Sequence, residues 1–333
     1  MIRSLLILLL SGLLFLGCES DIVVFQEDIT TPVVYCLLDQ DQPIQSLRLS
    51  RSYSSYRASE PPDSPDSINL KRALDIALEQ VKGGVVEKRV FFKPVDIEKD
   101  SGFFPLTEHW IYQTDMEILS DTRYNLIIYL DDSDKIVYST CTTVAPFEIT
   151  NPAYPLIRNL HFQTDHNPQF YWTGSVNAGI YQLGFILHYD EISATEMERK
   201  KVDLSFNTKF VADESARFIN QSINSNQFYI KLNEQLISDP GLLRKFVGID
   251  SYIVCGGTEL AYLVKLQTSG QTFSLMEYTN ILNGIGVFSS ILSRQTNGFI
   301  LTDQTIDSLA YGHYTYDLNF LDRNGVREEG GGK

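Results

Sequence analysis

Short β-prone runs recur along the chain, some with alternating apolar and polar residues and some continuously apolar, as in 32–38, and these patterns are typical of half-buried and of buried β-strands. In the first half such runs occur at 32–38, 44–50, 73–81, 85–92, 107–117, 123–130 and 135–144. The polar turn 39–43 joins the first two runs into a predicted hairpin. Gly83 and Gly84 stand between the next two runs and supply the positive φ angles of a tight hairpin turn.

The second half carries the same pattern, interrupted by several other signals. Its expected strands are 156–163, 169–173, 179–189, 226–232, 248–267 and 299–302, with a bulge or bend at Gly256–Gly257. Short helices are predicted within 233–246 and over 303–310. The charged stretch 191–220 is predicted to be an extended hairpin or an insertion, and 273–288 a compact apolar loop with two glycines.

These runs predict a mainly-β fold of two antiparallel β-sandwich domains of the immunoglobulin or fibronectin III type, with a few short helices in the second. Trp172 and Tyr181 are placed like the core aromatics of such a module. The prolines of 151–155 predict a linker, because each removes a backbone donor. The expected segments are a signal peptide 1–17, a lipid-anchored tether 18–31, an N-terminal β-sandwich 32–148, a C-terminal β-rich domain with insertions 149–322, and a flexible tail 323–333, whose glycines are either native or an added sequence.

The first residues read as an export signal. Arg3 precedes an apolar run, 5–16, that is too short to span a bilayer but suits the apolar region of a signal peptide. Gly17 and Cys18 then match a lipobox, in which the cysteine receives a diacylglyceryl group and becomes the mature N-terminus. An ordinary cleaved signal with an incidental cysteine is the alternative, since Phe15 is a less usual residue three positions before the cysteine.

Charge and cysteine content narrow the choice of partners. Without residues 1–17 the chain has 26 basic and 42 acidic side chains, a net charge of −16, so no surface for nucleic acid or anionic lipid headgroups is expected. The membrane attachment is therefore expected to depend on lipid alone. Besides Cys18 the chain has Cys36, Cys141 and Cys255, an odd number that leaves at least one free thiol. Cys36 and Cys141 are either bridged or two free buried thiols.

The sequence contains no recognisable catalytic motif. His161 and His166 flank Asp165, but no helix puts them on one face, so they are interpreted as surface or turn residues and not as metal ligands. The acidic run 131–134 lacks the glycine and the distal glutamate of a calcium loop, and is interpreted as a hairpin turn. No nucleophile elbow, phosphate-cradling loop or zincin helix is present. We therefore expect no catalytic residue, no metal and no cofactor.

A Tyr-, Ser- and Arg-rich stretch, 50–59, is the best candidate for binding. Rigid amphipathic rings interleaved with small donors are the composition that binding loops use. Arg51, Tyr53, Tyr56 and Arg57 are the candidate partner- or ligand-binding residues. A solvated loop that happens to be rich in tyrosine is the alternative interpretation.

Three stretches carry a family resemblance: the lipobox at Cys18, the opening 32–39 with 47–50, and the late stretch 278–288. Together they resemble an uncharacterised family of Bacteroidota outer-membrane lipoproteins encoded near SusC-like TonB-dependent receptors. The resemblance implies two β-sandwich-like domains and residence at the outer membrane, and no enzyme activity. The late motif comprises Asn280, Asn283, Gly284, Gly286 and Phe288. Its alternative interpretation is a tight turn at the glycines with Ile285, Val287 and Phe288 in the core.

The function expected from these features is that of a non-enzymatic lipoprotein on the cell surface. Its expected partner is an integral outer-membrane β-barrel, in the first place a SusC-like TonB-dependent receptor that it assists in nutrient capture, together with other lipoproteins of such a complex. A structural subunit of an outer-membrane-protein biogenesis or secretion assembly is the alternative. A secreted-type hydrolase on a β scaffold is a third class, which a buried carboxylate pair in a cleft would support.

Overall fold

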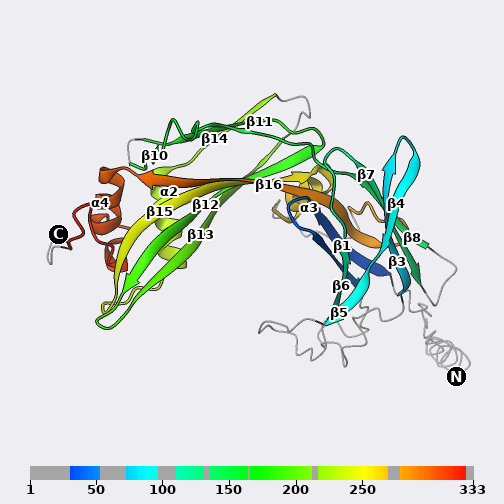
Figure 1. The fold of residues 1–333 in the computed structure, drawn as a ribbon, viewed down its shortest axis with the longest axis horizontal. Coiled ribbons are helices and arrows are strands. Elements are labelled where there is room, and N and C mark those ends of the chain that lie inside the picture. The colour runs from blue at the N-terminus through cyan, green and yellow to red at the C-terminus, as the bar shows by residue number, and fades with distance from the viewer. Residues whose placement is uncertain are drawn as a thin grey trace, which may run out of the picture. The chain divides into compact units, whose positions relative to one another are not determined.

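β-strands dominate the chain, as the alternation of apolar and polar positions predicted (Figure 1). The computed structural model describes residues 31–52, 73–96, 110–130, 136–163, 166–211, 217–268 and 278–327. Within these ranges the chain forms sixteen strands, three α-helices and one short 3₁₀-helix, so the mainly-β class is confirmed. All three α-helices lie in the second half, again as predicted.

The largest sheet has nine strands and contains both early and late segments of the chain. Its strand order is β13 (Met197–Phe210), β12 (Ala178–Ile192), β15 (Leu243–Gly257), β16 (Ile285–Leu301), β1 (Pro32–Asp39), β2 (Ile44–Arg51), β6 (Trp110–Asp115) and β5 (Lys93–Asp96), with β10 (Asn159–Leu160) also paired to β16.

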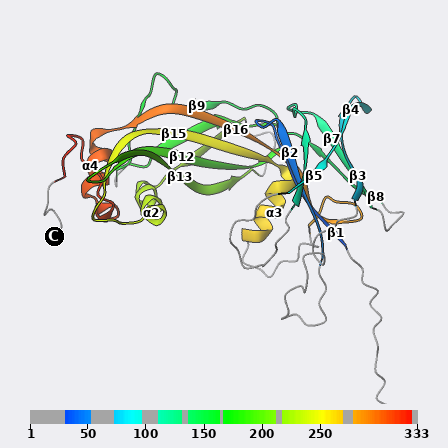
Figure 2. The ribbon, with the colours of Figure 1, turned by 60° about the horizontal axis from the view of Figure 1, so that its bottom comes forward.

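Two smaller sheets complete the β structure. One has the order β4 (Val85–Phe91), β3 (Ala73–Lys82), β7 (Arg123–Leu130) and β8 (Ile136–Thr142), and the other β14 (Phe218–Ser222), β11 (Gln169–Thr173) and β9 (Ile149–Asn151). The helices are α2 (Ser225–Gln235), α3 (Thr258–Thr268), α4 (Asp303–Tyr311) and the 3₁₀-helix η3 (Tyr316–Leu318). Figure 2 shows α3 following directly on β15.

The predicted hairpins of the first half are present. β1 and β2 pair antiparallel, and so do β3 with β4 and β7 with β8. The φ angles of Gly83 and Gly84 are +58° and +82°, which is the left-handed backbone that the tight turn between β3 and β4 needs. The stretch 191–220 holds the turn and the second strand of a long hairpin, whose first strand, β12, lies mostly before residue 191.

One pairing was not anticipated from the sequence. β1 pairs with β16 in parallel, and the register runs from Val33 with Ile285 to Asp39 with Ile291. A parallel ladder between segments this far apart leaves no local turn signal. This ladder joins segments of both predicted domains in one sheet. The division into two domains at residue 148 stays a prediction.

The apolar side chains gather in two clusters. The first includes Val34, Phe288 and residues of β2, β3, β7 and β8, and the second joins β11, β12, β13 and β15 to α2 and α4. Trp172 and Tyr181 are fully buried in the second cluster with ring centroids 5.5 Å apart, as predicted for core aromatics. Cys36, Cys141 and Cys255 are buried free thiols, which decides the open choice between a bridge and free thiols.

One predicted strand is a helix, and another is a helix in its second half. The range 226–232 lies in α2, where the Asn224 side chain accepts from the backbone N–H groups of Asn226 and Gln227 and so caps the helix. Phe228 and Leu232, four residues apart, are fully buried on one face, a helical spacing within a run that also fits a strand. The helix expected within 233–246 is only the last turn of α2, 233–235.

The prediction of a strand over 248–267 is also wrong for its second half. β15 ends at Gly257, and α3 begins at the next residue, so Gly256–Gly257 marks a change from strand to helix and not a bulge. β-branched and aromatic residues after the glycines favoured a strand by composition, but tertiary contacts of Ala261 and Leu263, both buried, favour the helix.

The last predicted elements fall close to their expected places. The run 299–302 is the end of the long strand β16, and the expected helix 303–310 is α4. Of the predicted tail, residues 323–327 are described: the Arg327 guanidinium donates to the carbonyls of Ala310 and Phe320 at 3.1 and 3.2 Å. A further bond to the Tyr316 carbonyl, at 2.5 Å, anchors the chain at Arg327 against both α4 and η3.

Candidate functional site

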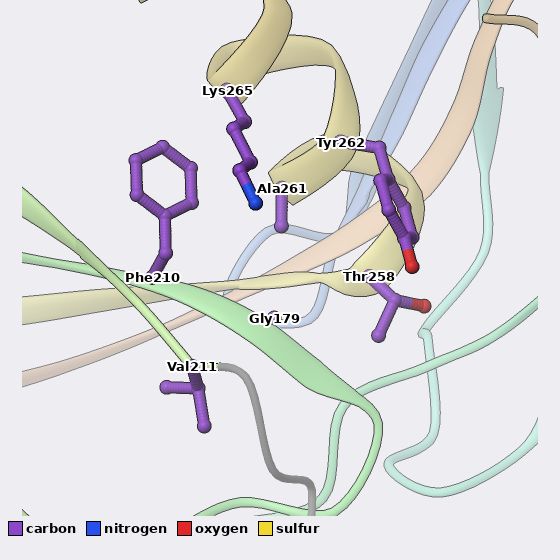
Figure 3. Close-up of a pocket in the computed structure, with 7 residues that line it drawn as sticks. All are labelled: Gly179, Phe210, Val211, Thr258, Ala261, Tyr262 and Lys265. Atoms are coloured by element: carbon purple, nitrogen blue, oxygen red, sulfur yellow. The ribbon is translucent and has the colours of Figure 1, made fainter.

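A pocket lies where α3 meets the ends of β12 and β13 (Figure 3). Its volume is about 310 Å³, which accommodates a small ligand. The lining residues are Gly179, Phe210, Val211, Thr258, Ala261, Tyr262 and Lys265.

The first turn of α3 is held against the main sheet by a polar contact. The Ser289 hydroxyl of β16 donates to the Glu259 carboxylate at 3.0 Å. Two turns of helix then carry Ala261, Tyr262 and Lys265 along one side, since residues three and four apart are neighbours on a helix. The pocket is therefore formed by a helix face on one side and strand ends on the other.

The pocket combines apolar walls with one cation. Phe210, Val211 and Ala261 provide the walls, and Figure 3 shows the Lys265 side chain extending from α3 toward the strands between Phe210 and Ala261. Within the described ranges, Lys265 makes no ion pair with a carboxylate. The arrangement suits a small ligand with an apolar body and a negatively charged or strongly hydrogen-bonding group.

Two stacked tyrosines stand beside this pocket. The rings of Tyr262 and Tyr278 lie 5.3 Å apart with an interplanar angle of 29°, and Tyr262 is 57% exposed. Burial, with a further contribution from the negative charge of Glu259, raises the pKa of Tyr278 to about 12. The Tyr278 hydroxyl therefore remains protonated, and a hydrogen-bond donor, throughout the physiological pH range.

The late motif predicted as a site makes internal contacts. The Asn280 side-chain amide donates to the Phe288 carbonyl at 2.7 Å, and its oxygen accepts from the Phe288 N–H at 3.0 Å. The Asn280 side chain thus makes the two hydrogen bonds with the backbone of β16 that a neighbouring strand would make. The Asn283 amide donates to the Ile136 carbonyl of β8 at 2.9 Å. Gly286 lies in β16 against Val34 of β1, and Phe288 is fully buried. These contacts fasten the loop before β16 to β1 and β8.

The other predicted binding and anchoring residues are mostly beyond what the structure describes. Arg51 ends β2, where its backbone pairs with Pro32. Tyr53, Tyr56 and Arg57 lie outside the described residues, as does Cys18. The structure therefore leaves the predicted binding stretch 50–59 and the lipidation site as predictions.

The structure describes only some of the residues that were considered, and not expected, as metal ligands. The rings of His161 and His166 are 5.1 Å apart, and His161 Nδ1 is 2.9 Å from the Thr302 hydroxyl. Asp165 and the acidic run 131–134 fall in undescribed segments. In the described part of the chain, no group of three His, Cys, Asp or Glu side chains is placed to hold a metal ion.

The pocket could not be predicted while the residues of α3 were expected to form a strand. Ala261, Tyr262 and Lys265 share a side only with the period of a helix, whereas a strand would place neighbours on opposite faces. The available signal was local: Gly256–Gly257 followed by Thr258 and Glu259, a small polar residue and an acid where a helix begins.

No known family model matches the chain, and no curated protein matches it. Among the helices of the described segments, none is both long and apolar enough to cross a membrane.

Proposed function

We propose that this protein is a non-enzymatic lipoprotein of the outer membrane, anchored through Cys18 and facing the cell surface. The observation that supports this most strongly is the stretch 14–20, in which an apolar signal region ends at Gly17–Cys18. Acyl chains on this cysteine would contribute about 0.8 kcal/mol per buried CH₂, so two or more chains make a stable anchor. The family resemblance of the opening strands points in the same direction.

The anchored body acts in this proposal as a subunit of a complex with an integral outer-membrane β-barrel, in the first place a SusC-like TonB-dependent receptor, and helps it to capture a nutrient. The Tyr- and Arg-rich composition of the stretch 50–59 supports a protein contact, because tyrosine and arginine are enriched among the residues that contribute most to interface energies. The pocket at α3, with Lys265 between apolar walls, supports the retention of a small ligand.

Lipidation is tested by labelling cells with an alkynyl fatty acid and detecting the tag on the protein. The wild type should be labelled and Cys18→Ser should not. Ser20→Ala changes a neighbouring residue and keeps the thiol, so it is the matched control and should be labelled like the wild type. Equal labelling of Cys18→Ser would refute the anchor.

The partner is tested by gentle detergent extraction of the native protein and identification of the proteins that remain bound. Recovery of a TonB-dependent receptor is the expected result. Recovery of an assembly or secretion barrel in its place would favour the alternative, a structural subunit of an envelope machinery. A protein extracted without any barrel would contradict both.

A further inference from the structure

The pocket at α3 has a floor that is fixed by close packing of the helix on β12. A Cβ atom added to Gly179 would lie 2.7 Å from the Ala261 Cβ and 2.9 Å from the Thr258 Cα. The Val211 N–H donates to the Gly179 carbonyl at 3.0 Å. The glycine therefore lets α3 lie directly on the strand, and the fold itself holds the floor and the walls of the pocket in place.

The polar groups of the lining decide which charge a ligand can carry. Lys265 is the one cation among the described lining residues, and none of these residues is acidic. Thr258 and Tyr262 add hydroxyls, which both donate and accept hydrogen bonds and therefore select no charge. Glu259, from the first turn of the same helix, accepts from the Ser289 hydroxyl at 3.0 Å and is not in the lining. The pocket therefore attracts a negatively charged group.

This local charge is opposite to that of the whole chain. The chain has 42 acidic and 27 basic side chains and a net charge of −15, and a surface of this sign repels anions. In the described segments Lys265 has no carboxylate partner, and Figure 3 shows its ammonium group between Phe210 and Ala261. An anion that binds here would meet the ammonium group at one end and apolar walls at the other.

We propose that this pocket binds a monocarboxylate whose body is apolar and no larger than one ring or a short alkyl chain. The volume of about 310 Å³ is at the lower end for ligand pockets, which limits the size. One lysine ammonium group is a compact point charge and suits a single carboxylate. The carboxylate would bind Lys265, and the apolar body would pack against Phe210 and Val211.

Two other classes of small anion fit the lining less well. A phosphate monoester carries about two negative charges and three acceptor oxygens, and is typically bound by several donors or an arginine fork, which the described lining lacks. An amino acid adds an ammonium group, which loses its hydration in a pocket unless a carboxylate pairs with it. The described lining offers no carboxylate for this purpose.

This inference rests on the nutrient-capture part of the proposed function, for which it names a class of ligand. The test is a calorimetric titration of the full-length lipoprotein in detergent with phenylacetate and hexanoate, corrected by titration into detergent alone. At least one of them should bind at least about fivefold more tightly than its neutral amide, phenylacetamide or hexanamide. Raising the NaCl concentration from about 0.02 to about 0.5 M should weaken binding of the carboxylate and not of the amide.

Substitutions of Lys265 test whether this residue supplies the charge. Lys265→Met keeps a long unbranched side chain without the ammonium group, so it should weaken carboxylate binding about fivefold and leave amide binding within about twofold. Lys265→Arg keeps the charge and should stay within about threefold of the wild type. The matched control is Lys201→Met, because Lys201 is an exposed lysine of β13 outside the lining, and it should bind like the wild type. Both lysines are exposed, so folding is not in question for these variants.

Four results would overturn the inference: neither carboxylate binds, each carboxylate binds no more tightly than its amide, Lys265→Met binds the carboxylate as tightly as Lys201→Met, or phenylalanine or phenyl phosphate binds more tightly than phenylacetate. Co-purification separates this failure from failure of the proposed function. A barrel that co-purifies with a protein unable to bind carboxylates refutes only the ligand of the pocket, and carboxylate binding without any barrel partner refutes only the complex.

Discussion

Replacing Gly286 by alanine should destabilise the protein strongly, because this residue has both an unusual backbone and no space for a side chain. Its φ angle is +122°, a conformation that L-residues rarely adopt. A Cβ atom placed there would lie 1.9 Å from the Val34 carbonyl oxygen, which belongs to the backbone of the paired strand β1. No side-chain rotation relieves such an overlap, so β1 and β16 must separate locally.

The expected loss can be estimated from its two parts. The backbone strain of a residue other than glycine in a rare φ region costs about 1–3 kcal/mol. Separation of the strands also disturbs Val34 and Phe288, which are fully buried, and imperfect packing of such residues costs about 1–3 kcal/mol more. We therefore expect a decrease of about 2–6 kcal/mol in the free energy of unfolding, a large part of the usual 5–15 kcal/mol.

The assay is equilibrium unfolding in urea, followed by circular dichroism, on the wild type and two alanine variants. Gly83→Ala is the control: its φ is +58°, but nothing lies within 4 Å of the added Cβ, so only strain of about 1–2 kcal/mol is expected. If Gly286→Ala is no less stable than Gly83→Ala, the steric argument is wrong and the β1–β16 ladder tolerates a side chain at this position.

Three further outcomes are expected. Tyr53→Ala with Tyr56→Ala should weaken association with the proposed receptor by at least about 2 kcal/mol and leave the melting temperature unchanged; unchanged pull-down yield would remove this stretch from the proposed interface. The three buried cysteines, whose pKa values burial raises, should react with iodoacetamide at pH 8 only after denaturation, and fewer than three adducts by mass would indicate a bridge. Burial raises the pKa of Glu191, but the hydrogen bonds that Lys200 and Arg244 donate to its carboxylate outweigh burial, and the net effect lowers this pKa. The ionised Glu191 therefore stabilises the folded protein above its ordinary pKa of 4.5, and this stabilisation is lost as the pH falls through the pKa of the folded state. Urea midpoints from pH 7 to 3 should therefore fall more for the wild type than for Glu191→Gln, and parallel curves would contradict this.

The parts of the fold that depend on local chemistry were predictable from the sequence. Gly83–Gly84 between two alternating runs is sufficient for the β3–β4 hairpin, because only the turn residues and their neighbours decide it. The helix α4 also lies where the sequence predicted it, over 303–310. Trp172 was predicted as a core residue because its place resembles that of the core tryptophan in an immunoglobulin- or fibronectin-like module, and it is fully buried.

The parts that depend on distant contacts were not predictable. The runs that became α2 and α3 contain apolar residues that fit either period, and packing decided between them. Since the pocket needs α3, Lys265 could not be placed in a site from the sequence. The contact between Tyr252 and Gly184 likewise needs the register of β12 on β15, which a single strand does not encode.

The parallel pairing of β1 with β16 has a consequence for the order of folding. β1 is among the first described segments to be synthesised, but its partner, residues 285–291, comes near the end of the chain. Closing so long a loop is slow, and native topologies with high contact order fold slowly as a rule. Until then one edge of β1, with the apolar side chains of 33–38, has no partner and is open to pairing with other chains. Truncation before residue 285 should therefore produce aggregates and not a folded first half.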